Sequence, residues 1–275
     1  DEVFARKLER RLRETYHTSS IEVINAGVLS YCPLLEDLQY RHHLHILAPH
    51  LVMLNFYMSD VQDHMDYARN AVFSSDGTAL FVTEPSLRGS ATWVPALLSF
   101  EWVARHANAA KRRFDAGVEG SAFARDLDRY AWAVDGGPDL DREVTATLSP
   151  IADLQKLLEH YDIPFVLSTY PQPWQVSAEA TPLPPIRTQY GIGQNTVHLN
   201  DRPFRKLDAF AKEHNLPFIN ATSAFRNAPQ PAALFLANDF HFSPLGHDLY
   251  ADVLATYIIQ HSLVSSHLPT STSVR

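Results

Sequence analysis

The sequence predicts an α/β protein built on a parallel β-sheet, because short buried strands alternate with helices along the chain. The segments that read as strands are 21–27, 49–60, 162–173 and 217–222. The links in the first strand–helix–strand unit are short, so its strands are expected to run parallel with a right-handed crossover. The chain shows neither an internal repeat nor an obvious linker. A single domain over 1–262 is therefore expected, with a flexible tail over 263–275.

Helical spacing of apolar residues marks the segments between the strands. In residues 2–16 one apolar stripe is formed by Val3, Phe4, Leu8, Leu12 and Tyr16. The other helical segments are 34–47, 93–114, 121–134, 150–161, 203–214 and a terminal helix that begins at Pro244. The helices within 86–150 are expected to form an insertion on the domain.

Composition narrows the class of protein. The 275 residues are 45% hydrophobic and 11% aromatic, which is enough for a full core. A formal net charge of −8, with no Lys/Arg-rich run, argues against nucleic acid as a partner. No apolar run reaches the roughly 18 residues that a membrane-spanning helix needs. The single cysteine, Cys32, excludes an internal disulfide and a multi-cysteine zinc site.

Three polar clusters lie where a parallel sheet would bind a ligand. They are 27–31, 59–66 and 239–247, and each is expected near the carboxyl end of a strand. Ligands of open parallel sheets bind at that end of the sheet, so these clusters hold the candidate functional residues.

The last cluster contains an acid and a histidine just before the terminal helix. Asp239 and His241 are two residues apart, so in extended chain their side chains leave on the same side. The carboxylate can then fix one imidazole tautomer and leave the other ring nitrogen as a base. Ser243 and Pro244 suit the N-cap and first turn of the helix, and His247 is interpreted as structural. The alternative is a capped helix with a loop acid and a packed histidine.

Two further clusters invite a metal interpretation. The histidines of 42–50 lie on mixed faces of a predicted helix, which favours a solvated helix face over a zinc site. The candidate cation ligands of 59–66 are Asp60, Asp63, His64 and Asp66. That segment lacks the glycine and terminal glutamate of a calcium loop. No metal and no cofactor is therefore expected, and no G-x-S-x-G elbow occurs.

Taken together, "VINAGVLSY", "LVMLNFYMSD" and "DFHFSPLGH" resemble the SGNH hydrolase superfamily, the GDSL-type esterases and acyltransferases. The three segments occur in the order of that family, and the resemblance covers most of 1–262. It implies a three-layer αβα fold with a flavodoxin-like parallel sheet. It also implies that His241 is the catalytic base and Asp239 its orienter. The D-x-H spacing before "FSPLGH" is similar to the branch that contains polysaccharide O-acetyltransferases and related esterases.

The resemblance also implies an oxyanion hole. Gly27 matches the glycine whose N–H lines it in the family. The family's G-x-N-D block reads Tyr57-Met58-Ser59-Asp60 here, so both its glycine and its asparagine are replaced. By position, the Ser59 hydroxyl stands in for the asparagine amide.

The nucleophile that the resemblance implies is not in the sequence. The family's serine belongs to a Gly-Asp-Ser block on a first strand, and no such block occurs here. This strand is expected just upstream of Asp1, between the strands of 21–27 and 49–60 in the sheet. Any export signal is also expected upstream of Asp1. The sequence does not determine the compartment, although an extracytoplasmic location is favoured.

Three functions follow from these observations. The first is a serine esterase or O-acyltransferase that acts on an O-acyl ester such as an acetylated carbohydrate. The second is a non-catalytic binding or assembly module on the same fold. The third is a metal-dependent hydrolase that uses 59–66 together with Asp239 and His241.

The sequence does not decide which residues form the substrate pocket. The aromatic and basic residues of the loop after 162–173 are Tyr170, Trp174, Arg187 and Tyr190. They are interpreted either as the wall of an acyl or sugar pocket or as a packed loop. No substrate-binding residue is assigned.

Overall fold

In the computed structural model, the residues described are 3–83, 130–133, 140–180, 193, 195–237 and 239–264. Several expectations fall outside them. These are the helix predicted over 93–114, most of that over 121–134, the loop residues Arg187 and Tyr190, and most of the tail.

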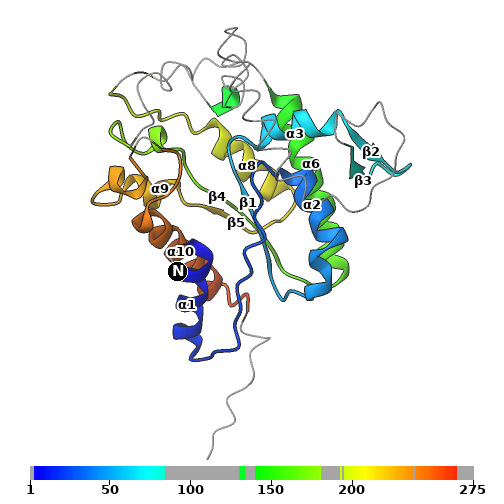
Figure 1. The fold of residues 1–275 in the computed structure, drawn as a ribbon, viewed down its shortest axis with the longest axis horizontal. Coiled ribbons are helices and arrows are strands. Elements are labelled where there is room, and N and C mark those ends of the chain that lie inside the picture. The colour runs from blue at the N-terminus through cyan, green and yellow to red at the C-terminus, as the bar shows by residue number, and fades with distance from the viewer. Residues whose placement is uncertain are drawn as a thin grey trace, which may run out of the picture.

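A three-stranded parallel sheet forms the centre of the protein (Figure 1). Its strands are β1 (Val52–Phe56), β4 (Phe165–Thr169) and β5 (Phe218–Asn220), in the order β1-β4-β5. Val52 pairs with Phe165, and Leu167 pairs with Phe218. Each strand lies inside one of the predicted apolar segments, and all five residues of β4 are buried. The prediction of a parallel α/β sheet is therefore confirmed.

Helices cover both faces of this sheet, so the fold has three layers. One layer holds α1 (Phe4–Tyr16) and α10 (Pro244–Gln260), which pack on Val166 and Ile219. The opposite layer consists of α2 (Pro33–His42), α3 (Asp60–Ala68), α6 (Asp141–His160) and α8 (Arg202–Glu213). Its apolar side chains pack on Phe165 and Leu167. Successive residues of β4 thus face opposite layers, as the pleat of a strand requires.

The segment over 21–27 is not a strand, which corrects the prediction. Its backbone groups bond to side chains instead of a neighbouring strand. Arg13 Nε donates to the Ile21 carbonyl at 2.6 Å, and the Val23 N–H donates to Glu9 Oε2 at 2.8 Å. Among the described strands, none pairs with the second edge of β1. An extended apolar segment becomes a strand only when another strand takes its backbone hydrogen bonds.

The helix predicted over 150–161 begins at Asp141, so Pro150 lies inside α6. Proline removes one helical hydrogen bond and usually favours the first turn. Here Val144, Leu148 and Ile151 continue one buried stripe across the proline. Packing of this stripe outweighs the local cost of proline, which the sequence pattern does not reveal.

Two other features differ from the prediction, one a helix boundary and the other a hairpin. The helix expected over 34–47 ends at His42 and continues as the 3-10 turn η1 (Leu44–Leu47). An antiparallel hairpin, β2 (Ala71–Phe73) and β3 (Ala79–Val82), was not predicted. Its strands have three and four residues, too few for a clear alternating pattern.

In the described part of the chain, no helix is long and apolar enough to cross a bilayer.

Candidate functional site

The Asp239–His241 loop is held between two segments of regular structure. It follows the 3-10 turn η5 (Pro231–Leu234) and leads into α10. Backbone hydrogen bonds close the loop, from Leu236 N–H to the His241 carbonyl at 2.9 Å and from Ser243 N–H to the Leu234 carbonyl at 2.9 Å. Because both ends are paired, the loop projects from a fixed base.

The N-cap predicted at Ser243 is confirmed. Its Oγ accepts from the Gly246 N–H at 3.3 Å and donates to the Ala233 carbonyl at 2.5 Å, and Pro244 begins the helix. Gly246 is required by close packing, since a Cβ there would lie 2.0 Å from the Leu234 carbonyl oxygen. The cap and the glycine together bring η5 against the first turn of α10.

Asp239 and His241 are in direct contact. His241 Nδ1 lies 2.5 Å from Asp239 Oδ1, which also accepts the His241 backbone N–H at 3.0 Å. Burial acts to raise the pKa of Asp239, but the hydrogen bonds from the His241 backbone and ring outweigh it and lower the pKa below its ordinary value. An ionised Asp239 holds the proton of His241 on Nδ1 and leaves Nε2 as the basic nitrogen.

The imidazole of His241 is open to solvent. Its side chain is 76% exposed, and that of Asp239 is 42% exposed. Among the described residues, Asp239 is the only hydrogen-bond partner of the His241 ring. A nitrogen in this position can take a proton from a group that is brought to it.

Aromatic side chains on either side of His241 anchor the loop to the carboxyl end of the sheet. Phe240 packs on Trp174 at a ring distance of 5.6 Å and on Tyr130 at 6.1 Å. Phe242 packs on Tyr170, the residue after β4, at 4.7 Å. The candidate acid–base pair therefore lies beside the strand ends, where a parallel sheet binds ligands.

The ends of β1 and β4 are joined by a polar contact. Tyr57, the residue after β1, donates from its hydroxyl to Gln172 Oε1 at 3.0 Å, and its ring lies 5.4 Å from that of Tyr170. Gln172 and Trp174 are fully buried. Trp174 was interpreted either as part of a pocket wall or as part of a packed loop, and it lies in the packed core.

The two candidate oxyanion donors are each engaged locally. Ser59 is buried at the N-terminus of α3, where its Oγ donates to Asp63 Oδ2 at 3.1 Å. Gly27 is exposed, and its N–H donates to Asn25 Oδ1 at 3.1 Å. Neither group contacts His241 among the described hydrogen bonds.

The acidic segment 59–66 forms internal contacts. Asp60 is buried and accepts the Tyr57 N–H at 2.9 Å. His64 is also buried, and burial lowers its pKa to about 4. In the described ranges, no group of three or more His, Cys, Asp or Glu side chains is placed to hold a metal ion.

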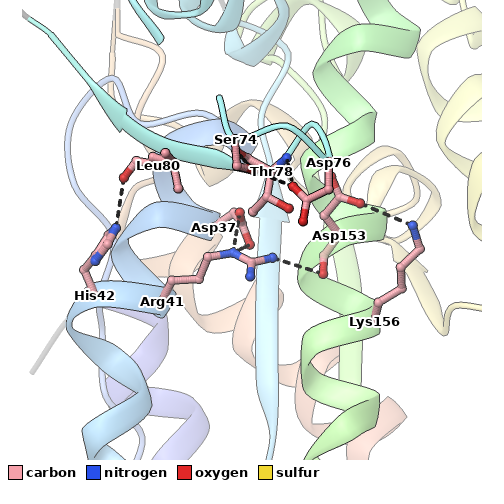
Figure 2. A network of polar contacts seen from close by, with 9 residues as sticks. All are labelled: Asp37, Arg41, His42, Ser74, Asp76, Thr78, Leu80, Asp153 and Lys156. Carbon is pink, nitrogen blue, oxygen red and sulfur yellow. Dashed lines mark hydrogen bonds and ion pairs between the residues drawn. The ribbon is translucent and has the colours of Figure 1, made fainter. Parts of the chain in front are cut away.

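His42, the first histidine of the 42–50 run, belongs to a separate polar network that ties α2 to α6 and the hairpin (Figure 2). His42 Nε2 lies 3.1 Å from the Leu80 carbonyl oxygen of β3. Arg41 donates from Nε to both carboxylate oxygens of the buried Asp37 at 2.9 and 2.8 Å, and from Nη2 to the Asp153 carbonyl at 3.3 Å. These contacts assign a structural role to this part of α2.

A buried polar cluster that supports the site was not predicted from the sequence. It joins Asn55 of β1, Ser168 of β4 and Tyr250 of α10, with Tyr250 donating to Asn55 Oδ1 at 2.6 Å. The signal was present, since Asn55 and Ser168 are polar residues within two mostly apolar strands.

Comparisons with known proteins give a similar solved structure. No protein-family model and no curated protein matches the sequence. One similar solved structure is the lipase/acylhydrolase from Enterococcus faecalis. The likeness covers 95% of this chain and 87% of that chain, at 13% sequence identity and a TM-score of 0.46. At these values the likeness assigns neither a family nor an activity.

Proposed function

We propose that the protein is an SGNH-type (GDSL-type) serine esterase or O-acyltransferase that acts on an O-acyl ester such as an acetylated carbohydrate. The observation that carries the proposal is the 2.5 Å contact between Asp239 Oδ1 and His241 Nδ1. This pair belongs to an exposed loop at the carboxyl end of a parallel sheet. The sequence segments that resemble the SGNH family include this loop.

The proposed chemistry uses His241 as the base. Nε2 takes the proton of a serine hydroxyl as its oxygen attacks the ester carbonyl, and Asp239 stabilises the imidazolium that forms. The imidazolium then gives this proton to the leaving alkoxide, and an acyl-serine remains. In a second step, His241 takes a proton from water or from a sugar hydroxyl, whose oxygen attacks the acyl carbonyl. His241 then gives this proton to the serine oxygen as the acyl–serine bond breaks.

The serine itself is proposed to precede Asp1 in the natural protein. Among the described residues, no serine, threonine or cysteine side chain bonds to the His241 ring. The second edge of β1 has no strand partner in the described ranges, so a further strand could pair there. For Gly27 and Ser59 to stabilise an oxyanion, their donors must first leave Asn25 and Asp63.

These internal contacts of Gly27 and Ser59 favour a second candidate function, a non-catalytic binding or assembly module. In that case the Asp239–His241 pair would bind a ligand without a chemical step.

The test is turnover of p-nitrophenyl acetate by this chain and by a version extended upstream to include the native preceding residues. We expect activity only in the extended form, with a loss of about a thousandfold or more in His241→Ala. The matched control is His261→Ala, which changes an exposed histidine at the end of α10.

Three outcomes would count against the proposal. An inert extended form favours the binding module. Activity of the shorter chain that depends on His241 means that the serine lies within residues 1–275. Activity that is lost on chelation but resists a serine-directed phosphonate favours a metal-dependent hydrolase that uses 59–66.

A further inference from the structure

Two short helical segments after β4 and β5 hold buried polar atoms without hydrogen-bond partners. The segments are η4 (Pro173–Gln175), taken with its N-cap residue Gln172, and α9 (Thr222–Arg226). The atoms are Gln172 Nε2, Gln175 Nε2, Thr222 Oγ1 and Arg226 Nη2. A buried polar group without a partner costs free energy, so a cluster of them indicates a bound water, ion or ligand.

Direct contacts bring the two segments together. Arg226 Nε donates to the Gln175 carbonyl at 2.7 Å, so the guanidinium lies against η4. Thr222 is one helical turn before Arg226 and lies on the same side of α9. Gln175 Oε1 accepts the Gln172 N–H at 2.8 Å, which fixes the amide so that Nε2 is left for another acceptor. Gln175 is fully buried and Thr222 is 4% exposed.

The unpartnered atoms are all able to donate, and one of them is cationic. An amide NH₂, a hydroxyl and a guanidinium N–H supply protons and no negative charge. Within the described ranges, no carboxylate forms an ion pair with the half-buried Arg226. Burial of Arg226 lowers its pKa, although the charge of Asp201 acts in the opposite direction. A guanidinium without a carboxylate ion pair, beside neutral donors, suits an anion better than a cation.

We infer that Gln175, Thr222 and Arg226 form a binding site for a small oxyanion, such as phosphate, sulfate or a carboxylate. The Gln172 amide extends this site toward Tyr57, because its Oε1 accepts from the Tyr57 hydroxyl. The inference does not depend on the proposed esterase activity, since it rests on a different set of side chains.

The first test is thermal unfolding of the chain with phosphate, sulfate or acetate, against sodium chloride at equal ionic strength. At about a hundredfold excess over Kd, a ligand that binds only the folded state should raise Tm by roughly 5 °C. Arg226→Gln should weaken this effect, with Kd rising about tenfold or more. Arg6→Gln, the same change at an arginine whose side chain is 60% exposed, should leave the effect intact.

A second variant keeps the test valid if Arg226→Gln does not fold. Thr222→Val preserves shape and removes a buried hydroxyl without a partner. Without oxyanion it should match or exceed the parent Tm, because the unpaired group is gone. With oxyanion it should gain less than the parent, since one donor to the ligand is lost.

Two results would overturn the inference. One is an equal rise of Tm in the parent, Arg226→Gln and Thr222→Val, which is the general effect of excluded salts. The other is no rise with any of the three anions, which means that only water occupies the site. A rise with phosphate and sulfate but not acetate assigns the site to tetrahedral anions, and the reverse assigns it to carboxylates.

Discussion

The hydroxyl of Tyr250 lies 2.6 Å from Oδ1 of Asn55, and this contact joins the helix behind the Asp239–His241 loop to strand β1. The hydroxyl also lies 3.1 Å from Ser168 Oγ of β4, and the Tyr250 side chain is fully buried. The ring of Tyr250 packs on Phe242 at 5.8 Å. The position of the loop is thus tied to two strands through one side chain.

Tyr250→Phe should lower the free energy of unfolding by about 1–2 kcal/mol. The ring keeps its packing, but Asn55 Oδ1 loses a buried donor and keeps only Ser168. Urea denaturation of the variant and the parent measures this loss, and the m value is expected to be the same for both. Tyr257→Phe, on the same helix and only half-buried, is the matched control and should change stability little. Equal effects of both substitutions would contradict the assigned role of the contact.

Gly246→Ala should destabilise the protein by about 2–3 kcal/mol. The new Cβ would lie 2.0 Å from the Leu234 carbonyl oxygen and 3.0 Å from the Phe242 Cβ, so η5 and α10 must separate. Gly27→Ala is the control, because its Cβ would meet only Asn25 Oδ1 at 3.2 Å. Chemical denaturation of the two variants compares them. A tolerated alanine at 246 would mean that the two segments do not pack closely.

Glu36 should make the protein less stable as pH rises. Its Oε2 is buried without a hydrogen-bond partner, and burial raises the pKa of Glu36 from 4.5 to about 8. Between these values the folded state holds a proton that the unfolded state has lost. The free energy of unfolding therefore contains a contribution that is full below about pH 4.5 and is lost as pH rises through about 8.

Glu36→Gln removes this titration and keeps the size of the side chain. Urea denaturation over a pH series should show a smaller decline of stability toward pH 8 in the variant than in the parent. Glu14→Gln, at an exposed glutamate of α1, should leave the decline unchanged. An identical decline in Glu36→Gln and the parent would refute the prediction.

His64 should contribute a slope of opposite sign at lower pH. Burial lowers the pKa of His64 from 6.5 to about 4, so the unfolded state binds a proton in this window and the folded state does not. Stability is therefore lost as pH falls from about 6.5 to about 4. His64→Phe should flatten this part of the stability profile, measured by the same denaturation series. His261→Phe, at an exposed histidine, should not.

Local patterns were enough to predict the parts of the fold that depend on neighbouring residues. The N-cap at Ser243 with Pro244 after it, and the apolar runs that contain β4 and β5, are read directly from adjacent residues. The segment 21–27 has the same apolar pattern, yet it is not a strand. Strand formation needs a partner, and no local pattern says whether one is in place.

The sequence by itself determined that Asp239 and His241 can contact each other, because their spacing lets one side chain reach the other without help from the rest of the fold. Only the tertiary structure decided which donors are already engaged. The Tyr250 hydroxyl reaches Asn55 across 195 residues of chain. The physical reason is that hydrogen bonds between distant residues depend on how helices and sheet pack, and packing brings together side chains whose separation in sequence carries no signal.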